Sequence, residues 1–192
     1  MRRCLMMVLA VALMLTASSA FAFNNDRAGF MLDLGAGAGI TSVKESGTII
    51  GFPVSASESK FSVLTNFRIG HGFNSQTQLY WFSRGSWMKS GDITFLSSVG
   101  GIGVSHFFAP TTPSGYLFGG VGLASLSAPF ESGSGANYGL GLVLGAGYEF
   151  SPHWSFEGVL AYAKTTEDEF PTIWDVDTKT LTFGATFNYL WY

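Results

Sequence analysis

The sequence predicts an all-β fold, an eight-stranded antiparallel β-barrel that spans a membrane, with a cleaved N-terminal signal peptide before it. The last stretch, residues 181–192, alternates apolar and small polar side chains at a period of two and ends on aromatic residues. The composition is 47% hydrophobic and includes 25 glycines and 18 phenylalanines. After Ala22 there is no run of about 18 apolar residues, which a membrane-spanning helix would show. Strands are therefore the expected spanning elements.

The first 22 residues have the pattern of a secretory signal peptide. Arg2 and Arg3 form a basic start, residues 5–15 are an unbroken apolar run, and Ala20-Phe21-Ala22 supplies the small residues of a cleavage site. The apolar run is shorter than the roughly 20 residues that a spanning helix needs. We therefore expect residues 1–22 to be removed.

Residues 23–192 are then expected to form one outer-membrane barrel domain. Cys4, the single cysteine, lies in the signal segment, so the exported chain is expected to have no thiol or disulfide chemistry. The formal net charge is −3 and becomes more negative once the two leading arginines are removed. A nucleic-acid partner is not expected, because binding to nucleic acid needs a basic stripe.

Strands follow from the alternation of side chains, and Pro, Gly, Ser and charged residues mark the breaks between them. The expected strands lie near residues 29–41, 60–70, 77–84, 92–108, 115–126, 137–150, 154–163 and 177–191. The six prolines all fall between these segments, as expected for a residue that cannot donate to a strand ladder.

The connections between the expected strands alternate in length. Tight ones are expected at 71–76, 109–114 and 151–153, long ones at 42–59, 127–136 and 164–176, and an intermediate one at 85–91. Short turns at one end and long loops at the other are typical of outer-membrane barrels. Because the number of strands is even, both termini are expected at the periplasmic end.

Strand parity assigns two faces to most segments. In the first segment, the outward face is Phe30, Leu32, Leu34, Ala36, Ala38 and Ile40. In the sixth, glycines share the inner face with Val143 and Glu149, which leaves room for bulky side chains from opposite walls. The segments 77–84 and 115–126 have no clear parity, because Leu79 to Phe82 run together, and their facing stays open.

In the last segment, one face is apolar and aromatic and the other is small and polar. The residues expected to face lipid are Leu181, Phe183, Ala185, Phe187, Tyr189 and Trp191, and those expected to face the lumen are Thr182, Gly184, Thr186 and Asn188. Aromatic side chains gather at the interfaces of such barrels. The expected periplasmic belt is Tyr148, Phe150, Trp154, Phe187, Tyr189 and Trp191.

The stretches Gly-Ala-Gly-Tyr-Glu-Phe-Ser-Pro-His-Trp-Ser-Phe-Glu (145–157) and Arg-Ile-Gly-His-Gly-Phe (68–73), with the aromatic carboxyl end, resemble the small OmpA/OmpX-type outer-membrane barrel families. This resemblance implies an eight-stranded barrel in the outer membrane of a Gram-negative bacterium. The chain departs from the family in that Trp191 holds the lipid register and Tyr192 lies one residue beyond it. A peptidoglycan-binding domain does not follow, so the wall-tethering role of longer relatives is not expected.

One group of residues resembles a catalytic site. His153, Ser155 and Glu167 are similar in spacing to the His, Ser and Glu of outer-membrane lipid A deacylases, in which Ser is the nucleophile and His its base. We expect His153 in a periplasmic turn and Glu167 in a loop at the opposite end. A ten-residue strand would separate them by roughly 33 Å. Because a triad depends on contact, no catalytic residue is expected.

Metal and cofactor sites are not expected either. His71 and His106 lie near the periplasmic rim without other residues at ligand spacing, so we assign both to the aromatic belt. The acidic run 167–169, with Asp175 and Asp177, has two interpretations: a divalent-cation site that bridges to lipopolysaccharide phosphates, or a solvated loop. The second is favoured, because the glycine of a tight calcium loop is absent.

Parity sends four charged side chains into the lumen, each near the periplasmic end of its strand. They are Asp33, Arg68, Glu149 and Glu157. A buried charge without a partner costs several kcal/mol, so we expect the four to meet across the lower lumen, with Arg68 bridging at least two carboxylates. A packed plug is favoured over a gate, because eight strands leave an interior that side chains fill.

The expected function is non-enzymatic: a small outer-membrane barrel that supports envelope integrity, or surface interactions through its extracellular loops. Two alternatives stay open, an enzyme that modifies lipid A and a narrow pore for solutes or ions. The expected partners are outer-membrane lipid and lipopolysaccharide, and the barrel-assembly machinery through the C-terminal strand.

Overall fold

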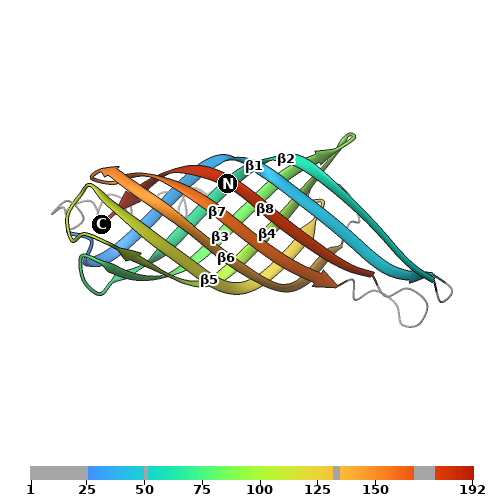
Figure 1. Ribbon diagram of the computed structural model, residues 1–192, viewed down its shortest axis with the longest axis horizontal. Helices are drawn as coiled ribbons and strands as arrows, with labels where there is room; N and C mark the ends of the chain where they lie inside the picture. The colour runs from blue at the N-terminus through green and yellow to red at the C-terminus, as the bar shows by residue number, and fades with distance from the viewer. Residues whose placement is uncertain (1–25, 50–51, 132–134, 167–175) are drawn as a thin grey trace, which may run out of the picture.

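Eight antiparallel strands close into one barrel in sequence order, with β1 paired to β8 (Figure 1). The computed structural model describes residues 26–49, 52–131, 135–166 and 176–192. The strands are β1 (Gly29–Ile49), β2 (Phe52–Gly72), β3 (Thr77–Ser90), β4 (Ile93–Phe107), β5 (Ser114–Ser127), β6 (Ala136–Ser151), β7 (Trp154–Thr166) and β8 (Val176–Trp191). No helix in this part of the chain is both long and apolar enough to cross a bilayer. The signal segment 1–22 lies outside the described residues.

The three tight connections that the sequence predicts are confirmed and share one end of the barrel, whereas two of the expected longer connections are largely replaced by strand. Three short connections, 73–76, 108–113 and 152–153, gather at the end where the C-terminus lies (Figure 1). We call it the turn end. The β1–β2 hairpin and the connection 128–135 belong to the opposite end, the loop end.

The expected long loop at 42–59 is wrong. β1 and β2 stay paired as far as Ile49 and Phe52, and β1 also pairs with β8 as far as Gly47 and Val176. Half of the residues in this stretch are Ser, Thr, Lys or Glu, so it lacks the apolar alternation that predicts strands. Backbone pairing does not need an apolar face once a strand extends beyond the membrane into water, and the hairpin therefore projects from the loop end.

The expected connection at 85–91 is also wrong. β3 continues to Ser90 and β4 starts at Ile93, so a two-residue turn, Gly91-Asp92, joins them. Gly91 has a φ of 61°, a left-handed conformation that glycine adopts without steric cost and that tight hairpin turns require. Gly85, at which the sequence predicts the end of the strand, is an interior residue of β3.

The structure settles the facing of the two segments that the sequence left open. In β3 the even-numbered side chains are buried, from Gln78 to Met88, and Trp81 is 49% exposed. In β5 the buried aromatics are Tyr116 and Phe118, whereas Leu117 and Leu123 point outward. The alternation in sequence does not indicate the facing of these two strands, because aromatic side chains fill the lumen as well as facing outward.

Aromatic rings from neighbouring strands occupy the space that inner-face glycines provide. A Cβ atom on Gly147 would lie 2.3 Å from Cζ of Tyr116, and one on Gly145 would lie 2.2 Å from Cζ of Phe118. These pairs are direct cross-strand partners of β6 and β5. The expectation that the rings come from opposite walls is therefore wrong at these positions, because an aromatic ring leans along the wall over the adjacent glycine.

The expected facing of the last strand is confirmed. Phe183 is 67% exposed, whereas Thr182 is 5% exposed and Asn188 is fully buried. The outer surface carries large apolar side chains on all sides, among them Ile40, Ile102 and Leu140. A soluble protein rarely exposes such a continuous apolar surface, so the outer wall is the one that meets lipid.

Candidate functional site

The lumen contains the buried charges of the barrel. Among the described residues, six Arg, Asp and Glu side chains are buried, three arginines and three carboxylates. They are Arg27, Asp33, Arg68, Arg84, Glu149 and Glu157. Sequence parity had selected four of these; Arg27 and Arg84 are additions from the structure.

The first group of contacts, which we call the lumen cluster, comprises Asp33, Arg68, Arg84 and Glu157. Arg68 pairs with Asp33, its cross-strand partner, and its Nη2 lies 2.6 Å from Oε1 of Glu157 on β7. Arg84 on β3 pairs with the other oxygen of the same carboxylate. Because β3 and β7 are four strands apart in a ring of eight, the pair between Arg84 and Glu157 crosses the full width of the barrel.

Polar and aromatic side chains surround the lumen cluster. The Tyr116 hydroxyl lies 2.7 Å from Oε1 of Glu157, and Nδ2 of Asn66 donates to Oδ1 of Asp33 at 3.0 Å. The guanidinium of Arg84 lies 4.7 Å from the ring centroid of Phe118, a distance at which a cation is attracted to an aromatic face. The charges are thus held by hydrogen bonds and rings as well as by each other.

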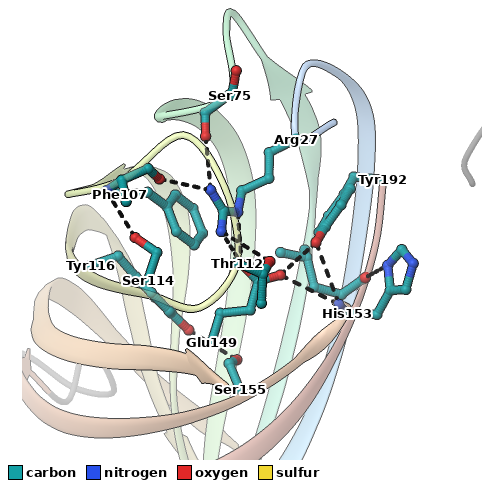
Figure 2. A network of polar contacts seen from close by, with 12 residues as sticks. Arg27, Ser75, Phe107, Thr112, Ser114, Tyr116, Glu149, His153, Ser155 and Tyr192 are labelled. Carbon is teal, nitrogen blue, oxygen red and sulfur yellow. Dashed lines mark hydrogen bonds and ion pairs between the residues drawn. The ribbon is translucent and has the colours of Figure 1, made fainter. Parts of the chain in front are cut away.

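The second group, which we call the mouth network, closes the turn end (Figure 2). Arg27 precedes β1, and its guanidinium uses all five N–H donors. Two point to Glu149, with Nε at 2.7 Å from Oε2. The others reach the carbonyls of Ser75 at 3.1 Å and Ala109 at 3.0 Å, and Oγ1 of Thr112 at 3.3 Å. One side chain therefore joins the N-terminal segment, two turns and β6.

Glu149 does not join the lumen cluster, so the expectation that all four predicted charges meet is corrected. Besides Arg27, its carboxylate accepts from the Tyr192 hydroxyl at 2.6 Å and from the backbone N–H of His153 at 3.3 Å. Parity could not find Arg27, because parity applies only within strands and Arg27 lies before the first one. The chain there turns into the mouth of the barrel.

Tyr192 extends the last strand's alternation by one step and points inward. It is 2% exposed, and its ring lies 4.7 Å from that of His153. Burial, together with the hydrogen bond to Glu149, raises the pKa of Tyr192 to about 12. The hydroxyl therefore stays protonated at neutral pH and donates to the carboxylate. Tyr192, the residue at which the chain departs from the family pattern, therefore belongs to the mouth network through its hydrogen bond to Glu149.

The residues of the deacylase-like group have other contacts. Nδ1 of His153 lies 2.8 Å from the carbonyl oxygen of Leu190, and the Ser155 hydroxyl lies 3.0 Å from that of Tyr116 inside the lumen. His153 is in the tight turn, as expected, with a φ of 73°. Glu167 lies outside the described residues.

The other metal candidates are placed as follows. His71 and His106 are exposed on the outer wall near the turn end, and Nδ1 of His106 lies 3.2 Å from the Thr77 hydroxyl. Residues 167–169 and Asp175 lie outside the described residues. Asp177 pairs with Lys164 at 2.8 Å. In the described ranges, no group of three potential ligands gathers.

The six residues of the expected aromatic belt lie on the outer wall at the turn end. Tyr148, Phe150, Trp154 and Phe187 are each 38–52% exposed, and Tyr189 and Trp191 are half-buried on the same face. The rings of Trp154 and Tyr189 are 4.6 Å apart, and those of Tyr189 and Trp191 are 4.4 Å apart.

Above the lumen cluster, buried hydroxyl groups and apolar side chains such as Leu64 and Val159 leave little empty space. Oγ1 of Thr41 lies 3.0 Å from Ser62, 2.5 Å from Ser86 and 2.9 Å from Thr182 in hydroxyl contacts that link four strands. A cavity beside Arg84 leaves about 30 Å³ for the centres of water molecules. A space of this size holds one water molecule or a few.

Comparison with known proteins gives one family. The model of the family described as "Outer membrane protein beta-barrel domain" matches residues 7–189. No curated protein matches the chain significantly. Similar solved structures include the Neisserial surface protein NspA (16% identity, 82% of this chain, 96% of that chain, TM-score 0.46) and Ail of Yersinia pestis (16%, 81%, 98%, 0.39). A third is OprG of Pseudomonas aeruginosa (13%, 86%, 98%, 0.44).

Proposed function

The chain belongs to the outer membrane protein β-barrel domain family, and from this premise we propose that it is a closed, non-enzymatic barrel that supports the integrity of the outer membrane of a Gram-negative bacterium. Its loops face the cell surface in this proposal, and both termini face the periplasm. The last strand, β8, with its outward aromatics, is the segment through which the barrel-assembly machinery engages the chain.

The observation that carries the proposal is the double closure of the lumen. The mouth network blocks the turn end, and the lumen cluster crosses the barrel from β3 to β7 above it. Each of the six charges has an opposite charge as a partner, and each is at most 7% exposed. An arrangement of this kind favours a rigid, sealed barrel over a pore.

The surroundings of Ser155 favour a non-enzymatic role. A serine nucleophile needs a base in contact and an open approach for its substrate. Ser155 is 2% exposed and faces the lumen, where Tyr116 contacts its hydroxyl. The imidazole of His153 contacts the Leu190 carbonyl and packs against Tyr192.

The orientation is supported by the placement of the aromatic belt and the short turns at the same end, since periplasmic turns are short in outer-membrane barrels. Residues 23–192 contain no cysteine, so the orientation can be tested with single introduced thiols. A membrane-impermeant maleimide should label Glu131→Cys in intact cells and Asn74→Cys after the outer membrane is disrupted. The reverse pattern would overturn the orientation.

A deletion strain tests the function. We expect faster entry of a hydrophobic fluorescent dye that an intact outer membrane excludes, restored by the wild-type gene, together with an unchanged lipid A mass spectrum. Altered acylation of lipid A would replace the proposal with the enzymatic alternative. Unchanged dye entry would reject the integrity role.

A further inference from the structure

Three lysines lie side by side on the outer wall, on three consecutive strands. Lys44 on β1 is the cross-strand partner of Lys179 on β8, and Lys179 is the partner of Lys164 on β7. All three side chains are exposed. Their neighbours Thr178 and Thr180 are buried, so the lysines face away from the lumen. We call these three residues the lysine row.

The lysine row lies at the height of the outer-leaflet headgroups if the turn end is periplasmic. Lys179 and Trp191 are twelve residues apart on β8. At about 3.3 Å per residue and a tilt of about 40°, this separation corresponds to about 30 Å along the barrel axis. The apolar band of such barrels is about 25 Å tall. With the aromatics of the belt at one interface, the row is at the other.

Between these two levels the outer face of the same strands carries no charge. The outward residues directly below the row are Ser42, Leu181 and Tyr162, followed by Ile40, Phe183 and Leu160. All but Ser42 are large and at least 39% exposed. A molecule bound at the row would therefore have anionic groups above and apolar chains below, along one continuous surface.

Like charges placed directly opposite each other destabilise a sheet. Lys179 belongs to two such pairs, one with Lys44 and one with Lys164. Asp177 offsets part of this repulsion through its contact with Lys164. Lys44 and Lys179 form no salt bridge with a described residue, although the charge of Asp177 also attracts Lys179. Among the described residues, three lysines thus share one paired carboxylate, that of Asp177, and a bound anion would reduce the cost of placing the lysines together.

We propose that the lysine row binds the phosphates of a phosphorylated, multiply acylated lipid of the outer leaflet, with the acyl chains lying on the apolar surface below. Two phosphates on one rigid headgroup suit three cations spaced at cross-strand distances of about 5 Å. The inference rests on the proposed orientation and membrane role, and it adds a specific lipid partner to them.

The direct test is binding of bis-phosphorylated, hexa-acylated lipid A to the refolded barrel in neutral detergent, followed by native mass spectrometry. The variant Lys44→Gln/Lys164→Gln/Lys179→Gln should bind on the order of a hundredfold more weakly, since each interfacial lysine contributes about fivefold. Lys89→Gln is the matched control, because Lys89 is an exposed rim lysine that faces Thr94 instead of another lysine. Its loss should not exceed about fivefold.

Two further ligands separate the sources of affinity. Dephosphorylated lipid A should bind as weakly to the wild type as to the triple variant, and glucosamine 1-phosphate without acyl chains should bind far more weakly than the lipid. Equal binding of bis-phosphorylated lipid A by wild type and triple variant would overturn the proposal. The proposal would also be overturned if the wild type bound dephosphorylated lipid A, or glucosamine 1-phosphate, as tightly as it binds bis-phosphorylated lipid A. None of these outcomes depends on dye entry in the deletion strain.

A second measurement compares the direction in which one substitution shifts the unfolding temperature in two media. In neutral detergent, Lys44→Gln should raise the unfolding temperature, because it removes the repulsion from Lys179. In bilayers that contain lipid A, the same substitution should lower it, because a phosphate contact is lost. A shift of the same sign in both media would contradict the proposal.

Discussion

Inside the barrel, positive charge is carried by arginine and is paired, whereas on the outer rim it is carried by lysine and is crowded. Arg27, Arg68 and Arg84 each contact a buried carboxylate. Lys44 and Lys179 instead face each other on the outer wall. The planar guanidinium donates in several fixed directions and is weakly hydrated, which suits a buried position in the lumen, whereas an ammonium group keeps its hydration at the rim. The difference indicates that the arginines of the lumen close the barrel, whereas the lysines of the rim are available to molecules outside it.

The largest effect is expected at the centre of the lumen cluster. Glu157→Gln leaves Arg84 without its carboxylate and Arg68 with one instead of two, and breaking a buried pair costs about 3–5 kcal/mol. Urea unfolding of the refolded barrel, followed by tryptophan fluorescence, measures this loss. The matched rim variant Asp177→Asn removes an exposed partner of Lys164 and should lower the free energy of unfolding far less, because an exposed ion pair contributes little to stability. Equal shifts in the two variants would remove the distinction between lumen and rim.

A lysine placed on the outer wall tests where the rim begins. Ala185 lies halfway between Lys179 and Trp191 on β8, and a lysine there should cost about 2–4 kcal/mol, as charges do at the bilayer midplane. Leu181→Lys, next to the lysine row, should cost about 0–1 kcal/mol, as near an interface. Unfolding of both variants in lipid vesicles provides the comparison. A greater cost at 181 than at 185 would place the membrane elsewhere on the barrel.

A smaller effect is expected in the mouth network, where the carboxylate keeps other donors. Arg27→Ala should cost about 2–3 kcal/mol, because Glu149 retains Tyr192 and the His153 N–H. The double variant Arg27→Ala/Glu149→Ala should cost less than the sum of the two single variants, since it leaves no uncompensated charge. A strictly additive double-mutant cycle, measured by urea unfolding, would mean that the two side chains do not interact.

Strand alternation and turn residues predicted the barrel, its strand number and the facing of β1, β6 and β8, because each of these follows from a period of two along a half-apolar wall. The same signal fails where a strand leaves the membrane, as in the β1–β2 hairpin, and where both faces are aromatic, as in β3. For the site, parity found Asp33, Arg68 and Glu157 together. It missed Arg84 because β3 had no readable parity.

The lysine row shows a different limit. Lys44, Lys164 and Lys179 are far apart in the sequence, and their adjacency depends on the register of β1, β8 and β7. Pairing register depends on the connection between two strands and on how the barrel closes, and it cannot be taken from the period of a single strand. A pattern shared by three strands therefore becomes visible after the register is known.

The conductance of the refolded protein in a planar bilayer tests the central claim, the sealed lumen, most directly. In 1 M KCl we predict no discrete current steps for the wild type, because the mouth network and the lumen cluster both cross the pathway. Arg27→Ala/Glu149→Ala alone should also remain silent, because the lumen cluster is intact behind it. Reproducible single-channel steps from the wild-type barrel would contradict the account and favour the pore.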